Sequence, residues 1–195
     1  MKVFRLSLQL PVHVNHAVRF VGIAVLAAFL NACGHSIALL PVSPISSATA
    51  PIPLGATVSI PVTTATHIHL VRSGLAGWAN TWEIHVGKAI SEYSKAYLAN
   101  TITSGTDAVI QIDLVSFDVR EFEARCELNF AIQRDGREVF QKSYHGKGLG
   151  YTARVVWTGA AGMESSMQKT TDEAMRSIFS RFLEDLAARS KERLL

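Results

Sequence analysis

The sequence predicts an α+β domain: an antiparallel sheet of about four strands with two amphipathic helices on one face, in the order β-α-β-β-β-α. Three observations predict it. One stretch alternates strictly between apolar and polar residues, Asp135-Gly136 is a strong hairpin signal, and apolar stripes at helical spacing lie before and after the strands. Placing both helices on one face of such a sheet would bury all of these apolar faces.

The domain is expected to start with a β-rich stretch, Ala56 to Arg72, in which Pro61 allows only an edge strand or a break between two strands. A helix should follow over roughly Thr81 to Ala99. Its apolar residues recur at three- and four-residue steps: Trp82, Val86, Ala89, Ile90, Tyr93 and Tyr97. Gly87 inside this helix costs about 1 kcal/mol relative to alanine, and close packing is the usual reason for it.

Three strands and a second helix are predicted next. Ala108 to Val119 is apolar at nearly every position, and Glu138 to about His145 is the return strand of the hairpin. Between them the alternating apolar residues are Phe122, Ala124, Cys126, Leu128, Phe130 and Ile132. Gly146, Gly148 and Gly150 are expected to open a loop that runs to Gly162. The final helix, Ser166 to Ala188, has a capping-box spacing at Ser165 and Gln168 and an apolar stripe made of Met167, Thr171, Ala174, Met175, Ile178, Phe182 and Leu186.

The start of the chain has the pattern of a secretory signal. Basic residues precede an apolar run, Phe20 to Leu30, which is too short to span a bilayer. The run ends in Leu30-Asn31-Ala32-Cys33, which resembles the lipobox of bacterial lipoproteins. The resemblance implies that the Cys33 thiol is joined to a diacylglycerol, that the chain is cut before Cys33, and that the new amino terminus is acylated. The membrane is then the first expected partner.

These patterns divide the chain into a signal peptide at 1–32, a tether at 33–55 that is rich in Pro, Ser and Ala, and a single periplasmic domain at 56–195. Ile37, Leu39 and Leu40 lie early in the tether. Two alternatives stay open for them: they dip into the membrane interface or they dock on the domain.

Charge and cysteine content exclude some functions. The first 32 residues hold three of the 19 Lys and Arg residues and none of the 16 Asp and Glu residues, so the remainder is formally neutral. Nucleic-acid binding, which needs a basic face, is therefore not expected. With Cys33 lipidated, Cys126 has no disulfide partner, and its place on the apolar side of a strand predicts core packing.

No catalytic or metal-binding pattern stands out. His67 and His69 would point the same way from a strand, but a third ligand at suitable spacing is missing, so surface histidines are expected rather than a metal site. Gly146-Lys147-Gly148 lacks the spacing of a phosphate loop. The acidic residues Asp113, Asp118, Glu121 and Glu123 are expected to face water in part. We expect neither an enzyme nor a cofactor.

Two apolar clusters are the candidate contact residues for a partner protein or a lipid. One is Leu149, Tyr151, Val155 and Trp157 in the predicted loop; the other is Trp78 and Trp82 before the first helix. The alternative is that both clusters pack on the domain's own core. The sequence does not decide between a groove or lid for a partner and ordinary core packing.

The order of elements behind a lipobox is similar to that of small outer-membrane lipoproteins of the YajG type and of auxiliary lipoproteins of envelope ABC transport systems. The similarity rests on Val109-Ile110-Gln111-Ile112 after a helix, the hairpin at Arg134-Asp135-Gly136-Arg137, the strand ending in Tyr144, and the terminal helix. It implies a non-enzymatic accessory or scaffold in envelope assembly or transport, with an envelope protein as the expected partner. Gly34 is not the aspartate that retains lipoproteins at the inner membrane, which favours the outer membrane. The alternative function is a carrier of lipid or another hydrophobic ligand in a groove between helices and sheet. A third hypothesis is a peptidoglycan-associated enzyme.

Overall fold

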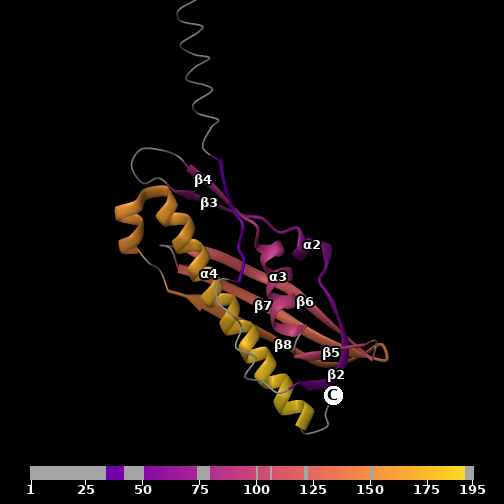
Figure 1. Cartoon of the computed structure of the whole chain (residues 1–195). Coiled ribbons are helices and arrows are strands. Elements are labelled where there is room, and N and C mark those ends of the chain that lie inside the picture. Colours follow the sequence, from indigo (N-terminus) through magenta and orange to yellow (C-terminus); the bar gives the residue numbers. More distant parts are fainter. Residues whose placement is uncertain are drawn as a thin grey trace, which may run out of the picture. The chain divides into compact units, whose positions relative to one another are not determined.

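A computed structural model describes residues 34–41, 51–73, 80–99, 101–105, 107–120, 123–149 and 152–191, with only the backbone described for some of them, among them 152–161. The chain divides into two units, residues 1–35 with 72–81 and residues 36–71 with 82–195; the contacts given below lie in the second. The strands and helices (Figure 1) are β1 Gly34–Ile37, β2 Ile52–Ser59, α2 Val62–Ala65, β3 His69–Ser73, β4 Asn80–Ile84, α3 Val86–Leu98, β5 Ile102–Ser104, β6 Ala108–Arg120, β7 Glu123–Arg134, β8 Arg137–Gly148 and α4 Thr152–Lys191.

The main sheet has five strands in the order β5-β2-β6-β7-β8, and α3 and α4 lie on the same face of it (Figure 1). The strands β6, β7 and β8 form an antiparallel meander, whereas β2 runs parallel to both β5 and β6. The predicted α+β class is therefore confirmed. The predicted antiparallel sheet of about four strands is only roughly matched, because the sheet is mixed, has five strands, and is accompanied by a three-stranded sheet in the order β1-β4-β3.

The meander follows the sequence pattern closely. Asp135 and Gly136 both have positive φ, at 51° and 72°, as a two-residue hairpin turn of type I′ requires. The alternating residues of β7 face the helices and are buried from Ala124 to Ile132, including Cys126. Phe130 contacts both Phe179 and Phe182 of α4, with ring centroids 5.5 and 4.1 Å apart. This aromatic cluster is the centre of the core, and the whole predicted stripe of the last helix is buried with it.

The predicted loop from Gly146 to Gly162 is wrong at both ends. Gly146 and Gly148 belong to β8, and α4 begins at Thr152 rather than Ser166, so Ser165 is not at a helix start. Both glycines are buried against α4: a Cβ at Gly148 would overlap the carbonyl of Thr170, and one at Gly146 that of Ala174. Glycine at alternate positions thus lets the helix backbone lie directly on the strand.

The helix predicted over Thr81–Ala99 starts later, at Val86. Residues 80–84 form β4 because Trp82 and Ile84 are buried while Glu83 between them is exposed, a period of two rather than 3.6. Close packing at Gly87 is confirmed. Its N–H donates to the His67 carbonyl at 3.0 Å, and a Cβ there would overlap backbone atoms of α2.

The segment before Ala56 contributes to the fold as well. Ile37 and Leu39 are buried, as are Ile52 and Leu54 of β2, so the alternative in which the early apolar side chains dock on the domain holds for these two. Leu40 is half exposed. The β-rich stretch predicted from Ala56 to Arg72 breaks at Pro61, which agrees with the second alternative, and α2 begins directly after this proline. Residues 42–50 of the predicted tether lie outside the described residues, as does Cys33.

Within the part of the chain that the structure describes, none of the helices combines the length and the apolar character needed to cross a bilayer.

Candidate functional site

The predicted contact residues fall into different environments. Leu149 follows β8, is 64% exposed, and its N–H donates to the Glu173 carboxylate at 3.1 Å. Trp82 is buried in β4 and takes the core-packing alternative. Trp78 and Tyr151 lie outside the described residues, as do the side chains of Val155 and Trp157 within α4.

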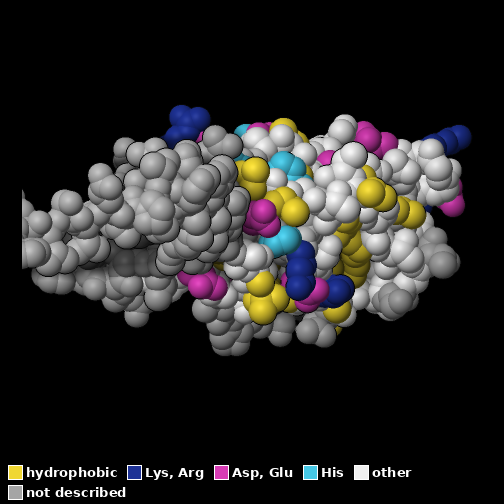
Figure 2. All heavy atoms as spheres, turned by 90° about the horizontal axis from the view of Figure 1, so that it is seen from above, with side chains coloured by type: hydrophobic (Ala, Val, Ile, Leu, Met, Phe, Trp, Pro, Cys, Tyr) yellow, Lys and Arg dark blue, Asp and Glu magenta, His cyan; other side chains and the backbone are white. Residues whose placement is uncertain are grey.

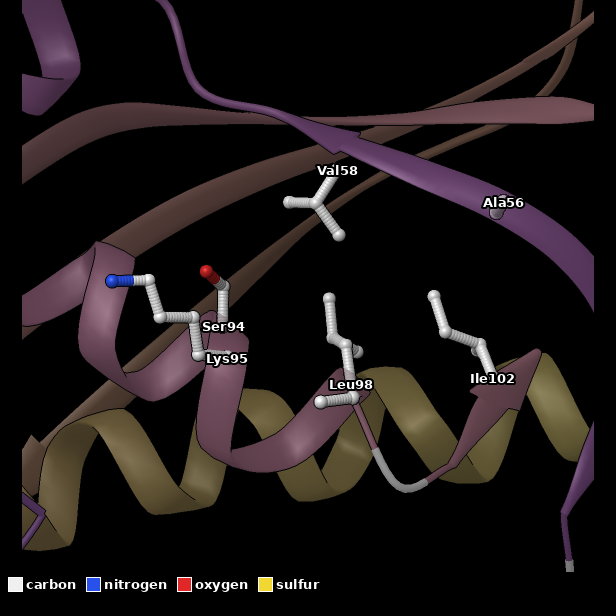
Figure 3. Close-up of a pocket in the computed structure, with 7 residues that line it drawn as sticks. Ala56, Val58, Ser94, Lys95, Leu98 and Ile102 are labelled. Carbon is white, nitrogen blue, oxygen red and sulfur yellow. The ribbon is translucent and has the colours of Figure 1, made fainter. Parts of the chain in front are cut away.

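An apolar groove lies between α3 and β2, in a place that no sequence pattern indicates (Figure 3). It has a volume of about 290 Å³ and is lined by Ala56, Val58, Ser94, Lys95, Leu98, Ala99 and Ile102. The groove exists because β5 pairs with β2 only as far as Ala56. Val58 lies two residues beyond this last paired residue and is partly exposed. Figure 3 shows Val58 and Leu98 pointing toward each other across it. The space fits one apolar side chain or a small apolar molecule.

A second cleft of about 470 Å³ contains the two predicted strand histidines. His67 and His69 line it together with Thr63, Thr64 and the β6 residues Leu114 to Phe117. The register of β6 shifts between Leu114 and Ser116, and the Leu114 N–H donates to the Thr64 hydroxyl at 3.0 Å, which holds α2 against this bulge. The cleft is therefore a built feature of the contact between α2 and β6.

The electrostatics of this cleft favour a neutral imidazole. Burial is the main cause that lowers the pKa of His69, and the nearby His67 lowers it further, whereas the Asp118 carboxylate raises it. The His69 ring meets Phe117 edge to face, with centroids 5.2 Å apart. Among the residues that the structure describes, no group of three or more His, Cys, Asp or Glu side chains could hold a metal ion.

The acidic residues named from the sequence lie in ion pairs and hydrogen bonds on the sheet. Asp113 accepts from Gln111 at 2.9 Å, Asp118 pairs with Arg120, and Glu123 pairs with both Arg125 and Lys147. Glu121 lies outside the described residues. Because Glu123 is held by two cations, the pKa of its carboxyl is lowered, which suits a permanent charge rather than proton transfer.

Two tyrosine–aspartate pairs hold α4, and sequence reasoning missed both. Tyr93 of α3 donates to buried Asp172, which also accepts from Arg176 at 2.8 Å. Tyr144 of β8 donates to Asp185 at 2.6 Å. In both tyrosines burial is the largest cause that raises the pKa, and the bond to the carboxylate raises it further. These hydroxyls stay protonated and serve as structural donors.

Cys126 is 3% exposed and sits in the core, and burial raises the pKa of its thiol to about 12. A thiol in this state is a packing group rather than a nucleophile.

Comparison with known proteins shows a fold rather than a function. No protein-family model matches the chain, and no curated protein is similar to it in sequence. A DUF330-family protein from Xanthomonas campestris has a similar structure, with a TM-score of 0.51 and 14% identity over 82% of this chain and 98% of that one. A candidate lipoprotein from Caulobacter crescentus CB15 gives 0.41 with 14% identity over 54% and 83%. A protein from Chlamydia trachomatis gives 0.43 with 10% identity over 71% and 99%.

Proposed function

We propose that this chain is a lipid-anchored, non-enzymatic accessory or scaffold protein of the bacterial cell envelope, held at the outer membrane on its periplasmic face. The observation that carries the proposal is that the first strand of the fold follows the lipobox-like motif directly in the sequence. The lipobox-like Leu30-Asn31-Ala32-Cys33 is followed at once by β1, and Ile37, four residues after Cys33, is buried in the core. This order supports cleavage before Cys33 and leaves a mature chain whose fold starts beside the acylated residue.

The described surface supports an accessory role rather than catalysis. Asp118 and Glu123 are held in ion pairs, Cys126 is in the core, and the His69 ring packs edge to face on Phe117. The same proposal includes a resemblance to the YajG type or to the auxiliary lipoproteins of ABC transport. Both would imply a protein partner in the envelope, without nucleic acid or a cofactor.

The anchor is tested by comparing the full chain with Cys33→Ser in bacterial cells. We expect the native chain to fractionate with the outer membrane and to incorporate a labelled fatty acid, and the Cys33→Ser chain to do neither. Labelling that survives the substitution would contradict the anchor. The scaffold role is tested by crosslinking in cells: a specific envelope protein should be trapped with the native chain, and repeated recovery of free monomer alone would count against it.

A carrier of a hydrophobic ligand is the second candidate, and the groove between α3 and β2 is the observation that favours it. Its volume of about 290 Å³ lies at the lower end of ligand pockets, and the space between α4 and the sheet is filled by aromatic rings. Native mass spectrometry of the extracted protein would show a bound ligand, and its loss on Ala99→Leu would assign the ligand to this groove.

A further inference from the structure

Exposed apolar side chains lie on β3 and on the segment just before it. Leu70 of β3 is 55% exposed, Ile68 directly before β3 is 46% exposed, and Val62 at the start of α2 is 76% exposed. We call Val62, Ile68 and Leu70 the β3 apolar surface. On the other two strands of this sheet, Ser36 of β1 and Glu83 of β4 are exposed as well. Three exposed aliphatic side chains on one short stretch of chain indicate a contact site.

Short links tie this surface to the residue that carries the lipid. Ser36 is three residues after Cys33, so their Cα atoms are at most about 11 Å apart. The Ser36 hydroxyl is 2.9 Å from the Nε2 atom of His85, and the His85 N–H donates to the Ile37 carbonyl. Two residues later, Gly87 donates its N–H to the carbonyl of His67, the residue before Ile68. The chain that leads from the anchor is thus hydrogen-bonded to His85, and Gly87, two residues further on, is hydrogen-bonded to the segment that carries the surface.

We propose that the β3 apolar surface rests on the bilayer into which the Cys33 lipid inserts. We choose the membrane as the partner of this surface because of the position of the anchor. Ser36 follows Cys33 by three residues, so a bilayer that holds the lipid of Cys33 lies close to Ser36. Three aliphatic side chains would bind a membrane weakly on their own. The anchor makes their contact intramolecular, so that a weak contact suffices to orient the domain.

The contact is shallow. Glu83 is exposed on β4, between the strands that carry Ser36 and Leu70, and a carboxylate does not enter the hydrocarbon layer. In Figure 2, hydrophobic side chains lie next to histidines, with acidic side chains close by. A surface of this mixed kind fits the headgroup level, where aliphatic side chains reach the acyl boundary and polar groups stay hydrated.

The proposal rests on the proposed function, since it needs the lipid on Cys33, and the test separates the two. Full chains carrying the photoreactive residue benzoylphenylalanine in place of Leu70 or, as a control, of Gln141 are produced in bacterial cells and irradiated. Gln141 is also exposed but lies on β8, at the edge of the main sheet opposite β5. Mass spectrometry then identifies the adducts and, in the same sample, the acylation of Cys33.

We expect phospholipid adducts from position 70 at several times the yield from position 141. Equal yields from an acylated chain, or a protein adduct at position 70 in place of lipid, would overturn the proposed contact and leave the anchor intact. A chain without acylation at Cys33 would overturn the anchor itself. Leu70→Asp, placed on the same exposed position, should leave the fold and the acylation unchanged but increase the cleavage of the anchored domain by added protease.

Discussion

The two helices of the domain meet the sheet in opposite ways. At β8, Gly146 and Gly148 remove the side chains between strand and helix, and the backbone of α4 lies directly on the strand. At β2, by contrast, Val58 and Leu98 face each other across a groove of about 290 Å³ because β5 ends at the level of Ala56. The first contact tolerates no added atom, and the second has room to spare. The sheet therefore fixes the position of α4, whereas the edge beside α3 is the adaptable side.

The tight contact should be broken most severely by Gly148→Ala. The added methyl group would overlap the Thr170 carbonyl, so α4 has to move away from β8, at a cost of about 3 kcal/mol or more in the free energy of unfolding. Urea denaturation followed by circular dichroism measures the loss. Lys147→Ala is the matched control, because Lys147 is exposed and its ion pair with Glu123 is worth at most about 1 kcal/mol. Equal midpoints for the two variants would show that the contact is looser than described.

The hydrogen bonds that fix α4 should differ in strength. Tyr93→Phe leaves one oxygen of buried Asp172 without the tyrosine donor and should lower the free energy of unfolding by about 1–3 kcal/mol. Tyr144→Phe should cost about 1 kcal/mol or less, since Asp185 is partly exposed and keeps Lys142 at 2.6 Å. Thermal unfolding of both variants beside the native chain measures the order, and a larger loss for Tyr144→Phe would reverse it.

At the open contact, Ala99→Leu should be nearly neutral. Ala99 is exposed at the end of α3 and lines the groove, so a larger side chain can enter free space without displacing its neighbours. We expect a change within about 0.5 kcal/mol of the native stability, as for ordinary surface substitutions. A loss comparable to that of Gly148→Ala would show that the groove is not open in solution.

The smallest expected effect is a pH dependence at His69. Because burial lowers the pKa of His69, folding disfavours its protonated imidazole. The free energy of unfolding should therefore decrease as the pH falls below about 6.5, the ordinary pKa of histidine. Nuclear magnetic resonance titration should show a folded-state pKa below that value. Asp118→Asn should lower it further and His67→Ala should raise it. A pKa above 6.5 would mean that Asp118 outweighs burial.

How far the sequence predicts this fold depends on how local each signal is. The hairpin at Asp135-Gly136, the alternation of β7 and the stripe from Met167 to Leu186 are local patterns, and the structure confirms them. The parallel pairing of β2 with β6 joins residues about fifty positions apart, and nothing in either segment indicates it. The alternate spacing of the β8 glycines fits a strand, but a glycine-rich run is also typical of a loop, which is the structure predicted there from the sequence.

The candidate surfaces were harder to predict for the same reason. The groove depends on where β5 stops, and the histidine cleft depends on a bulge in β6, and both are properties of strand pairing rather than of single residues. The pairing of Tyr93 with Asp172 joins two helices; the predicted stripe of α4 is confirmed in full, and that of α3 is confirmed from Val86 onward. Only Cys33 could be assigned a chemical role from adjacent residues alone, because the lipobox is read as a linear motif.

The intact mass of the protein isolated from bacterial membranes shows directly whether the chain is anchored through Cys33. We expect a chain that begins at Cys33 and carries a diacylglycerol on its thiol and an acyl chain on its amino group. A chain that begins elsewhere, or that begins at Cys33 without lipid, would contradict it.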